Sequence, residues 1–290
     1  MDYNVLRKDI EEKCLREAVK DPKKRRVEVS QRASGSASGL PFEPWTRDIL
    51  RECGYTAFLQ EEFIGEIVKK LKDKGYKESK IEETIREKTW WGMKDYMISR
   101  GQLEAAFKGN EIPAYQQSIA DIVLFYGKNL AEDLNDVIII NVKSHDIDRE
   151  SRDPNIISAK RILELSKDVL EKAITHPEFI NKLNLWFVGI YYKRRRGYGE
   201  IQEVHVKDFF KLDVTKIPVI NFDAAIQIQW HVKNMIEKDD IDKLTFIENL
   251  AKEYIKRWNE FSRRRTQELE KTIENIKSLI ERIKSQRRLF

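Results

Sequence analysis

An unbroken run of aliphatic residues, from Val137 to Ile140, is the feature that most restricts the fold of this chain. The run continues as Asn141-Val142-Lys143 and follows a turn signal at Asn135-Asp136, so the spacing predicts a β-strand over 137–143. Strand side chains alternate between the two faces of a sheet, and consecutive apolar residues therefore indicate burial on both faces. The chain is expected to build a central strand with a covering layer on each side.

The composition is that of a folded protein outside the membrane. Hydrophobic residues make up 41% of the 290 residues, which is enough for a sizeable core. Charged residues reach 36%, and no apolar run approaches the roughly 18 residues that a spanning helix needs, so we expect no membrane contact. Cys14 and Cys53 are too few for a disulfide framework, and the first residues lack the apolar core of a signal peptide. A cytoplasmic protein is the expectation.

The remaining periodicity predicts an α/β fold with a mixed central β-sheet flanked by helices and with helical additions at both ends. Further strands are expected at 119–127, 185–192 and 227–232. Helices are expected over 3–19, from 42 to about 100, from Asp153-Pro154-Asn155 to about 174, and in the tail. We divide the chain into an N-terminal helical extension (1–30), a central domain (31–240) and C-terminal helices (241–290) that pack on this domain or on a dimer partner.

The sharpest chemical signal is an acid and a lysine on neighbouring strands. Asp121 lies in the strand before the central one, and Asn141 and Lys143 share one face of the central strand because side chains alternate. Hydrolysis of a phosphodiester needs such a cluster, since carboxylates hold Mg²⁺ and an ammonium offsets charge on the phosphate oxygens. Taken alone the motif is also compatible with a solvated strand end, because Asp and Lys are common there.

An acid followed by acid-x-Lys on a strand pair resembles the PD-(D/E)XK nucleases, and further segments resemble the HincII-type restriction endonucleases, a blunt-cutting branch related to EcoRV. These segments begin at Ser34 (SGSASGLPFE), Pro154 (PNIISA) and Ile220 (INFDAAIQIQWHV), and their order and the spacing from Lys143 to Asn155 also match. The resemblance covers roughly residues 30 to 235 and implies that 31–240 is the catalytic and DNA-recognition domain.

The resemblance implies roles for individual residues. Asp121 and the residue at 141 would be the metal-binding pair, Lys143 the catalytic lysine and Glu43 an accessory acid in the first core helix, with Mg²⁺ as the cofactor. Asn155 and the segment from 221 would help to read bases, and the small residues near 34–39 would face the DNA, where backbone N–H groups can approach phosphates closely. Together with Lys193 and Arg194, which are predicted from their basic cluster and not from the resemblance, the full set of predicted DNA contacts comprises Ser34, Gly35, Ser36, Ser38, Gly39, Ser144, Arg152, Pro154, Asn155, Lys193, Arg194, Asn221, Asp223 and Ala224.

One departure from the pattern is Asn141, where the second metal ligand is usually Asp or Glu. An amide oxygen can bind a metal but removes one negative charge, which is expected to weaken Mg²⁺ binding. Either the enzyme works with Asn at this position or the chain is an impaired form that binds DNA without cutting it. We expect Asn141→Asp to preserve or raise Mg²⁺-dependent cleavage.

The resemblance implies a type II restriction endonuclease that cuts double-stranded DNA at a short palindromic site, leaving blunt ends with 5′-phosphate and 3′-hydroxyl groups. A palindrome mirrors a two-fold protein, so a homodimer is expected, with a cognate DNA methyltransferase in the same restriction-modification system. The alternatives are a repair or recombination nuclease of the same fold and a catalytically impaired DNA-binding protein.

Other charged and apolar patterns are less specific. The net charge of +5 is a weak argument for an anionic partner, but basic clusters at 23–26 and 193–196 are suited to phosphate contacts, with a solvated turn as the alternative for 193–196. Among the histidines, which lack zinc-site spacing, His145 is expected to line the DNA cleft and His231 to serve the fold. In the tail, a short heptad seam can pack on its own domain or on a second subunit; it consists of Leu269, Ile273, Ile276, Ile280 and Ile283.

Overall fold

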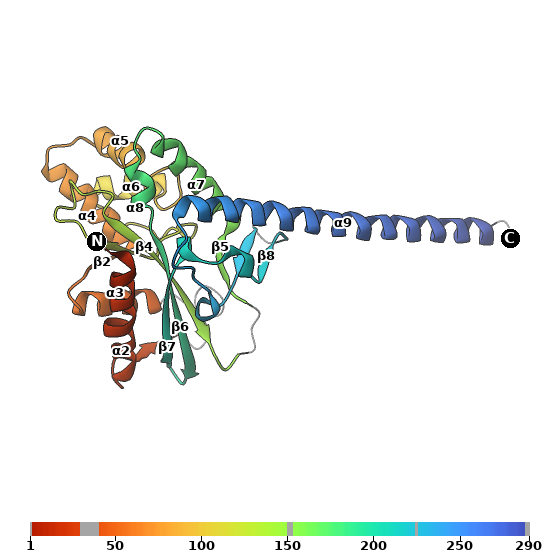
Figure 1. Ribbon diagram of the computed structural model, residues 1–290, viewed down its shortest axis with the longest axis horizontal. Coiled ribbons are helices and arrows are strands. Elements are labelled where there is room, and N and C mark those ends of the chain that lie inside the picture. Colours follow the sequence, from red (N-terminus) through yellow and green to blue (C-terminus); the bar gives the residue numbers. More distant parts are fainter. Residues whose placement is uncertain (1, 30–40, 150–152, 224–225, 288–290) are drawn as a thin grey trace.

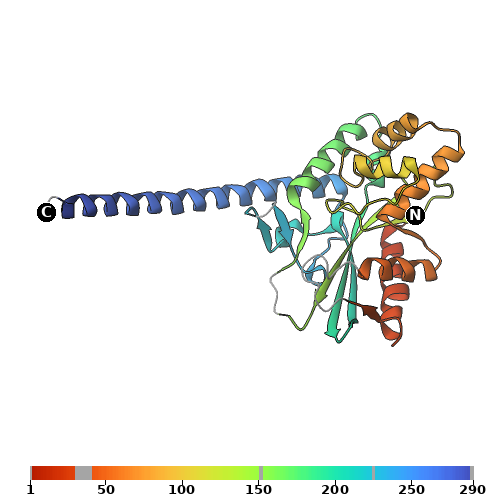
Figure 2. The same ribbon diagram turned by 180° about the vertical axis from the view of Figure 1, so that it is seen from behind.

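A six-stranded sheet forms the centre of the computed structural model, which describes residues 2–29, 41–149, 153–223 and 226–287 (Figures 1 and 2). The strand order is β1-β7-β6-β4-β3-β2, and a second, three-stranded sheet has the order β5-β9-β8. The strands are β1 (Arg26–Glu28), β2 (Thr56–Leu59), β3 (Ile122–Phe125), β4 (Val137–Asp146), β5 (Asn155–Ser158), β6 (Leu185–Arg195), β7 (Tyr198–Asp208), β8 (Val219–Asn221) and β9 (Gln227–Gln229).

Helices surround the central sheet. The α-helices are α1 (Tyr3–Asp9), α2 (Arg16–Lys20), α3 (Phe42–Glu52), α4 (Gln60–Asp73), α5 (Glu78–Lys88), α6 (Arg100–Lys108), α7 (Ala159–Ala173), α8 (Glu178–Lys182) and α9 (Lys243–Arg287). A π-helical segment, η1 (Ile10–Leu15), joins α1 to α2, and the short 3₁₀ turns are η3 (Phe209–Lys211), η4 (Val214–Lys216) and η5 (Val232–Asn234). None of the described helices combines the length and the apolar composition that crossing a bilayer requires.

Strand β4 lies inside the sheet, as its aliphatic run predicts. It pairs antiparallel with β3 and parallel with β6, and the remaining pairs in this sheet are antiparallel, which makes the sheet mixed. Ile138 and Ile140 face a cluster built with η1, α2 and α3, whereas Val137 and Ile139 face a larger cluster built with helices α4 to α7. Both faces are therefore covered, and the predicted α/β class is confirmed.

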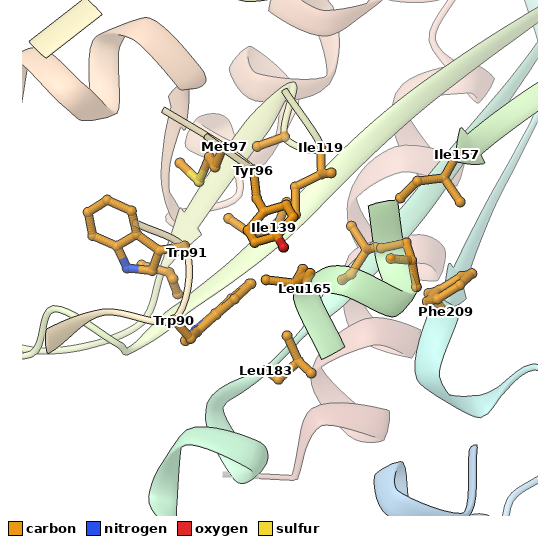
Figure 3. Packing of buried hydrophobic residues seen from close by; sticks show 14 of the residues in the cluster. Trp90, Trp91, Tyr96, Met97, Ile119, Ile139, Ile157, Leu165, Leu183 and Phe209 are labelled. Atoms are coloured by element: carbon orange, nitrogen blue, oxygen red, sulfur yellow. The ribbon is translucent and has the colours of Figure 1, made fainter. Parts of the chain in front are cut away.

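The larger cluster contains the bulkiest core side chains. Trp90 and Trp91 follow α5 and are fully buried; they lie near Ile139 of β4 and Leu165 of α7 (Figure 3). Helix α7 begins where the Ser158 hydroxyl accepts a hydrogen bond from the backbone N–H of Arg161 (3.3 Å). At about 25 cal/mol per Å² of buried apolar surface, such aromatic residues contribute strongly to the stability of this layer.

Two predicted elements differ in the structure. The segment from 42 to about 100 is not one helical region, because β2 separates α3 from α4 and pairs with β3, and residues 89–99 form turns. Asn155 does not open a helix: it begins β5, which pairs with β9, and the helix starts four residues later at Ala159. In both places sheet pairing outweighs the local helical signal.

The terminal segments pack differently. At the N-terminus, Ile10, Leu15 and Ala18 are buried against the central sheet, and β1 adds its edge strand. In α9 the first turns are buried through Phe246 and Leu250, after which the helix projects from the body (Figure 1). Its apolar residues further along are exposed by 42–60%; these are Leu269, Ile273, Ile276, Leu279 and Ile280. Within the described part of the chain, the seam is thus not covered by its own domain.

Candidate active site

Asp121 lies directly before β3, where backbone pairing from both sides holds it. Its N–H donates to Ile140 O (3.0 Å) and its carbonyl accepts from Gln60 N (3.1 Å). The carboxylate oxygen Oδ2 accepts a hydrogen bond from the backbone N–H of Val142 (2.6 Å). Asp121 is therefore locked between β4 and the start of α4, and its carboxylate lies beside the strand that carries Lys143.

Glu43 and Lys143 approach Asp121 from two different elements. Glu43 lies in the first turn of α3, which packs on the sheet through Phe42, and Lys143 follows the buried part of β4; both side chains are half-buried. Burial raises the pKa of Glu43 to about 8, assisted by the negative charge of Asp121 and opposed by the Lys143 ammonium. The structure thus brings these three predicted site residues together.

The same balance of forces acts on Asp121. Burial raises the pKa of its carboxyl group, while the Lys143 ammonium and the hydrogen bond from Val142 lower it. The lysine is therefore close enough to both carboxyl groups to stabilise their charged forms. An ammonium in this position is suited to offset charge on phosphate oxygens.

Glu61, in the first turn of α4, is a member of this cluster that the sequence reasoning missed. Its negative charge raises the pKa of both Asp121 and Glu43. Two adjacent acids at a helix start, Glu61 and Glu62, are a common pattern because they complement the helix dipole, and the pattern alone does not indicate a site. The backbone pairing of Gln60 with Asp121 is what brings Glu61 into the neighbourhood of these carboxylates.

Asn141 is buried within β4, with 4% of its surface exposed. Its Nδ2 donates to Ile119 O (3.1 Å), whereas its Oδ1 has no hydrogen-bond partner among the described residues. Because strand side chains alternate, Asn141 lies on the same face of β4 as Lys143. A buried carbonyl oxygen without a donor is uncommon in proteins and is suited to a cation or to an ordered water.

The donor set fits a magnesium ion. Within the described ranges, no group of three His, Cys, Asp or Glu side chains lies close enough to form a protein-only metal cage. Magnesium usually binds one or two carboxylates and keeps waters or substrate phosphates for its other positions, so a complete cage is not required. Asp121, with its fixed carboxylate, and Asn141, with its unpaired Oδ1, would hold such an ion. The ion would supply Lewis-acid activation of the phosphate and a lower pKa for an attacking water.

Several predicted DNA contacts lie in and near the small sheet. Asn155 is exposed, and its Oδ1 accepts a hydrogen bond from Gln229 Nε2 across the β5–β9 pair (2.7 Å). Asn221 Oδ1 caps the following turn by accepting from Asp223 N (3.0 Å), and Pro154 contributes its carbonyl to Trp230 N (3.1 Å).

The other predicted contacts are distributed along the long strands. Ser144 follows Lys143 in β4 and pairs with β6, where Lys193 and Arg194 precede the hairpin turn to β7. Arg194 lies 3.9 Å from the Asp146 carboxylate at the end of β4. The remaining predicted contacts lie outside the described residues: Ser34, Gly35, Ser36, Ser38, Gly39, Arg152 and Ala224.

A pair of histidines lies next to this region. His145, on the same strand face as Lys143, contacts His231 with ring centroids 4.5 Å apart. His231 Nε2 lies 3.8 Å from an Asp153 carboxylate oxygen, so His231 joins the end of β4 to the segment that leads into β5. Burial lowers the pKa of both histidines, which favours neutral rings at neutral pH.

Comparison with known proteins identifies the family. A comparison with curated proteins found no match. The sequence matches the family model described as Restriction endonuclease HincII over residues 15–280. The match spans most of the chain, from η1 into α9, and includes Glu43, Asp121 and Lys143. The chain therefore belongs to the HincII restriction endonuclease family and is a nuclease that acts on DNA.

Proposed function

We propose that this protein is a type II restriction endonuclease that uses Mg²⁺ to cut double-stranded DNA within a short palindromic site. The observation that carries the proposal is the meeting of Asp121, Glu43 and Lys143 at the point where β3 and β4 pair. Carboxylates beside one ammonium provide a cation site and a positive group for a phosphodiester. The products are blunt ends with a 5′-phosphate and a 3′-hydroxyl.

The chain's own residues support the chemistry in distinct ways. Asp121 and Asn141 hold the cation, and Lys143 lies beside them on β4, where it orients the attacking water or offsets charge on the phosphate oxygens. Glu43, whose pKa burial raises to about 8, adds an acid at the edge of the site. Asn155 reads a base edge in this proposal, which its exposure and the ability of Asn to pair with adenine in the major groove support.

The assembly that fits a palindromic site is a homodimer, in which each subunit cuts one strand. Its setting is the cytoplasm, within a restriction-modification system whose cognate methyltransferase acts on the same sequence. The two enzymes need not contact each other, because methylation of the recognition sequence by the methyltransferase is what protects that sequence from cleavage.

Digestion of a mapped plasmid tests the proposal. The full chain in MgCl₂ is expected to produce discrete bands, and EDTA is expected to abolish them. Lys143→Met is expected to lower the cleavage rate by about 10² to 10³, the usual cost of losing one transition-state donor. The matched control is Lys69→Met, which removes an exposed lysine from α4 and should cut at the wild-type rate.

Other cleavage patterns would refute it. Nicking confined to junctions or lesions would instead indicate a repair or recombination nuclease of the same fold. Asn141 favours one further candidate, a DNA-binding form with an impaired site. Tight sequence-specific binding without cleavage in Mg²⁺ or Mn²⁺, persisting in Asn141→Asp, would identify that form. Sequencing of the cut ends checks the blunt geometry and the terminal phosphate.

A further inference from the structure

The active site has one carboxylate fewer on its strands than the acid-x-Lys pattern requires. Position 141, two residues before Lys143, carries a neutral amide, so a cation there meets an oxygen ligand without its charge. An amide oxygen attracts Mg²⁺ less strongly than a carboxylate does. A compensating acid therefore has to come from another element if the site is to hold Mg²⁺ as tightly.

Helix α4 begins against the segment that carries Asp121. Leu59, the last residue of β2, pairs with Ile122, and the next residue, Gln60, donates its backbone N–H to Asp121 O (3.1 Å). Glu61 follows immediately in the first turn of the helix, and its side chain is half-buried. The backbone pairing thus places a carboxylate one residue away from the atoms that fix Asp121.

The two acids at the start of α4 have different surroundings. Glu62 accepts from Leu59 N (3.0 Å) and forms ion pairs with Arg47 and Arg51. Glu61 makes no hydrogen bond or ion pair with another described residue, although it lies near Asp121 and Glu43. A half-buried carboxylate among like charges is unfavourable unless a cation accompanies it.

A separate observation points to a ligand at the same place. Asn141 Oδ1 is buried and has no hydrogen-bond partner among the described residues, and it lies on the face of β4 that carries Lys143. The Nδ2 of the same amide is already committed to Ile119 O, which leaves Oδ1 available for a cation. Polar atoms from β4 and α4 therefore both lack a partner beside Asp121.

We propose that Glu61 supplies the second carboxylate of the divalent-cation site, in place of the acid that is absent at position 141. The proposal rests on the function proposed above and assigns to that site a third element, α4, besides the two strands. Glu61 binds the cation directly or through one of its waters, alongside Asp121 and the Oδ1 of Asn141. The competing explanation is that Glu61 only complements the helix dipole of α4.

Cation binding to the full-length protein separates the two explanations without reference to cleavage. Mn²⁺ serves as the probe, and free Mn²⁺ is measured by electron paramagnetic resonance in a titration of DNA-free protein. Glu61→Gln is expected to weaken Mn²⁺ binding by at least about tenfold, the loss that even an outer-sphere partner causes. The matched control is Glu66→Gln on the same helix, whose native carboxylate pairs with Lys70 (3.6 Å); it should bind Mn²⁺ as the wild type does.

A double variant that moves the negative charge from position 61 back to position 141 gives the decisive test. Glu61→Gln combined with Asn141→Asp returns the acid to the strand and is expected to bring Mn²⁺ affinity back to within about threefold of the wild type. Unfolding in EDTA gives a second readout, because Glu61→Gln removes repulsion and should leave the apo protein at least as stable while cation binding falls. A purely structural role for Glu61 predicts a loss of stability instead.

The outcomes also separate this inference from the proposed function. Equal Mn²⁺ affinity in Glu61→Gln and Glu66→Gln would overturn the role of Glu61, even if the wild type cuts DNA. A weakened Glu61→Gln that the double variant restores would support that role, even if no cleavage of plasmid DNA is found.

Discussion

Gly189, in the middle of β6, allows the turn η5 to pack directly on the central sheet, and we expect Gly189→Ala to destabilise the protein. A Cβ at this position would lie 2.5 Å from Val232 Cβ and 3.0 Å from its Cγ1, well inside ordinary contact distance. Val232 is 1% exposed, and the next residue donates its N–H to Tyr191 OH (3.1 Å), so η5 cannot easily withdraw. Overpacking of this kind costs about 1–3 kcal/mol.

The added Cβ is also expected to disturb the candidate active site, because Gly189 is the register partner of Lys143 in the parallel β4–β6 pair. A shift of β6 away from η5 displaces the strand that carries the lysine, and a misplacement of about 1 Å can cost about 10²-fold in rate. We therefore expect cleavage to fall together with stability.

Urea unfolding measures the loss, and the control is Gly101→Ala in α6, where an added Cβ meets nothing within 4 Å. Val232→Ala keeps the Cβ that causes the close contact, so it should not rescue Gly189→Ala, whereas Val232→Gly should. In a double-mutant cycle, the pair of Gly189→Ala with Val232→Gly is expected to be favourably coupled by about 1 kcal/mol or more. A Gly189→Ala variant as stable as the wild type, or an absence of coupling, would refute the packing argument.

Three further predictions concern stability, assembly and DNA binding. Burial raises the pKa of Asp208 to about 6. The neutral carboxyl group therefore stabilises the folded state fully below the unfolded pKa near 3.8, and this stabilisation is lost as the pH rises through 6. Relative to Asp208→Asn, the free energy of unfolding of the wild type, measured with urea, should fall by about 3 kcal/mol between pH 4 and pH 7. In α9, Ile276 is 50% exposed, and we expect Ile276→Asp to leave the unfolding free energy nearly unchanged but to weaken the proposed homodimer in sedimentation equilibrium. Unchanged association would count against a role of the seam in assembly. Lys193→Ala should lower DNA affinity for all sequences alike and reduce the salt slope by about 0.9 in anisotropy titrations, and an unchanged slope would exclude a phosphate contact.

The sequence alone predicts the centre of the fold because a strand buried on both faces has a run of consecutive apolar residues. The aliphatic run from Val137 to Ile140 has to be covered on both faces, and a central strand with a layer packed on each side of the sheet provides this cover. Asp121 and Lys143 were predictable for a related reason: each is a charged residue beside an apolar strand, and the strands that carry them pair. The heptad seam of α9 is likewise a local pattern, and its exposure agrees with one of the two packing alternatives that the sequence leaves open.

What the sequence does not reveal depends on contacts between distant segments. Asp153-Pro154-Asn155 has the composition of a helix start, but backbone pairing with β9 overrides this preference. Helix α7 therefore begins only at Ala159, with Ser158 as its N-cap. Glu61 is hidden for the same reason, since its neighbourhood with Asp121 arises from a pairing between residues some 60 positions apart. Local propensity contains no information about such pairings.

Charge balance relates the neutral Asn141 to the role proposed for Glu61. With a cation bound and Glu43 ionised despite its raised pKa, Glu43, Glu61 and Asp121 would carry three negative charges against the single positive charge of Lys143, and the surplus of two would match one divalent cation. An aspartate at 141 in addition to Glu61 would raise the surplus to three within a site where burial already raises the pKa of both Asp121 and Glu43, so Asn141→Asp alone is expected to preserve cleavage rather than to raise it. Ionising another carboxylate there would be costly. In the role proposed for Glu61, a neutral Asn141 together with an acidic Glu61 would keep the charge suited to magnesium while one carboxylate lies on the helix instead of the strand.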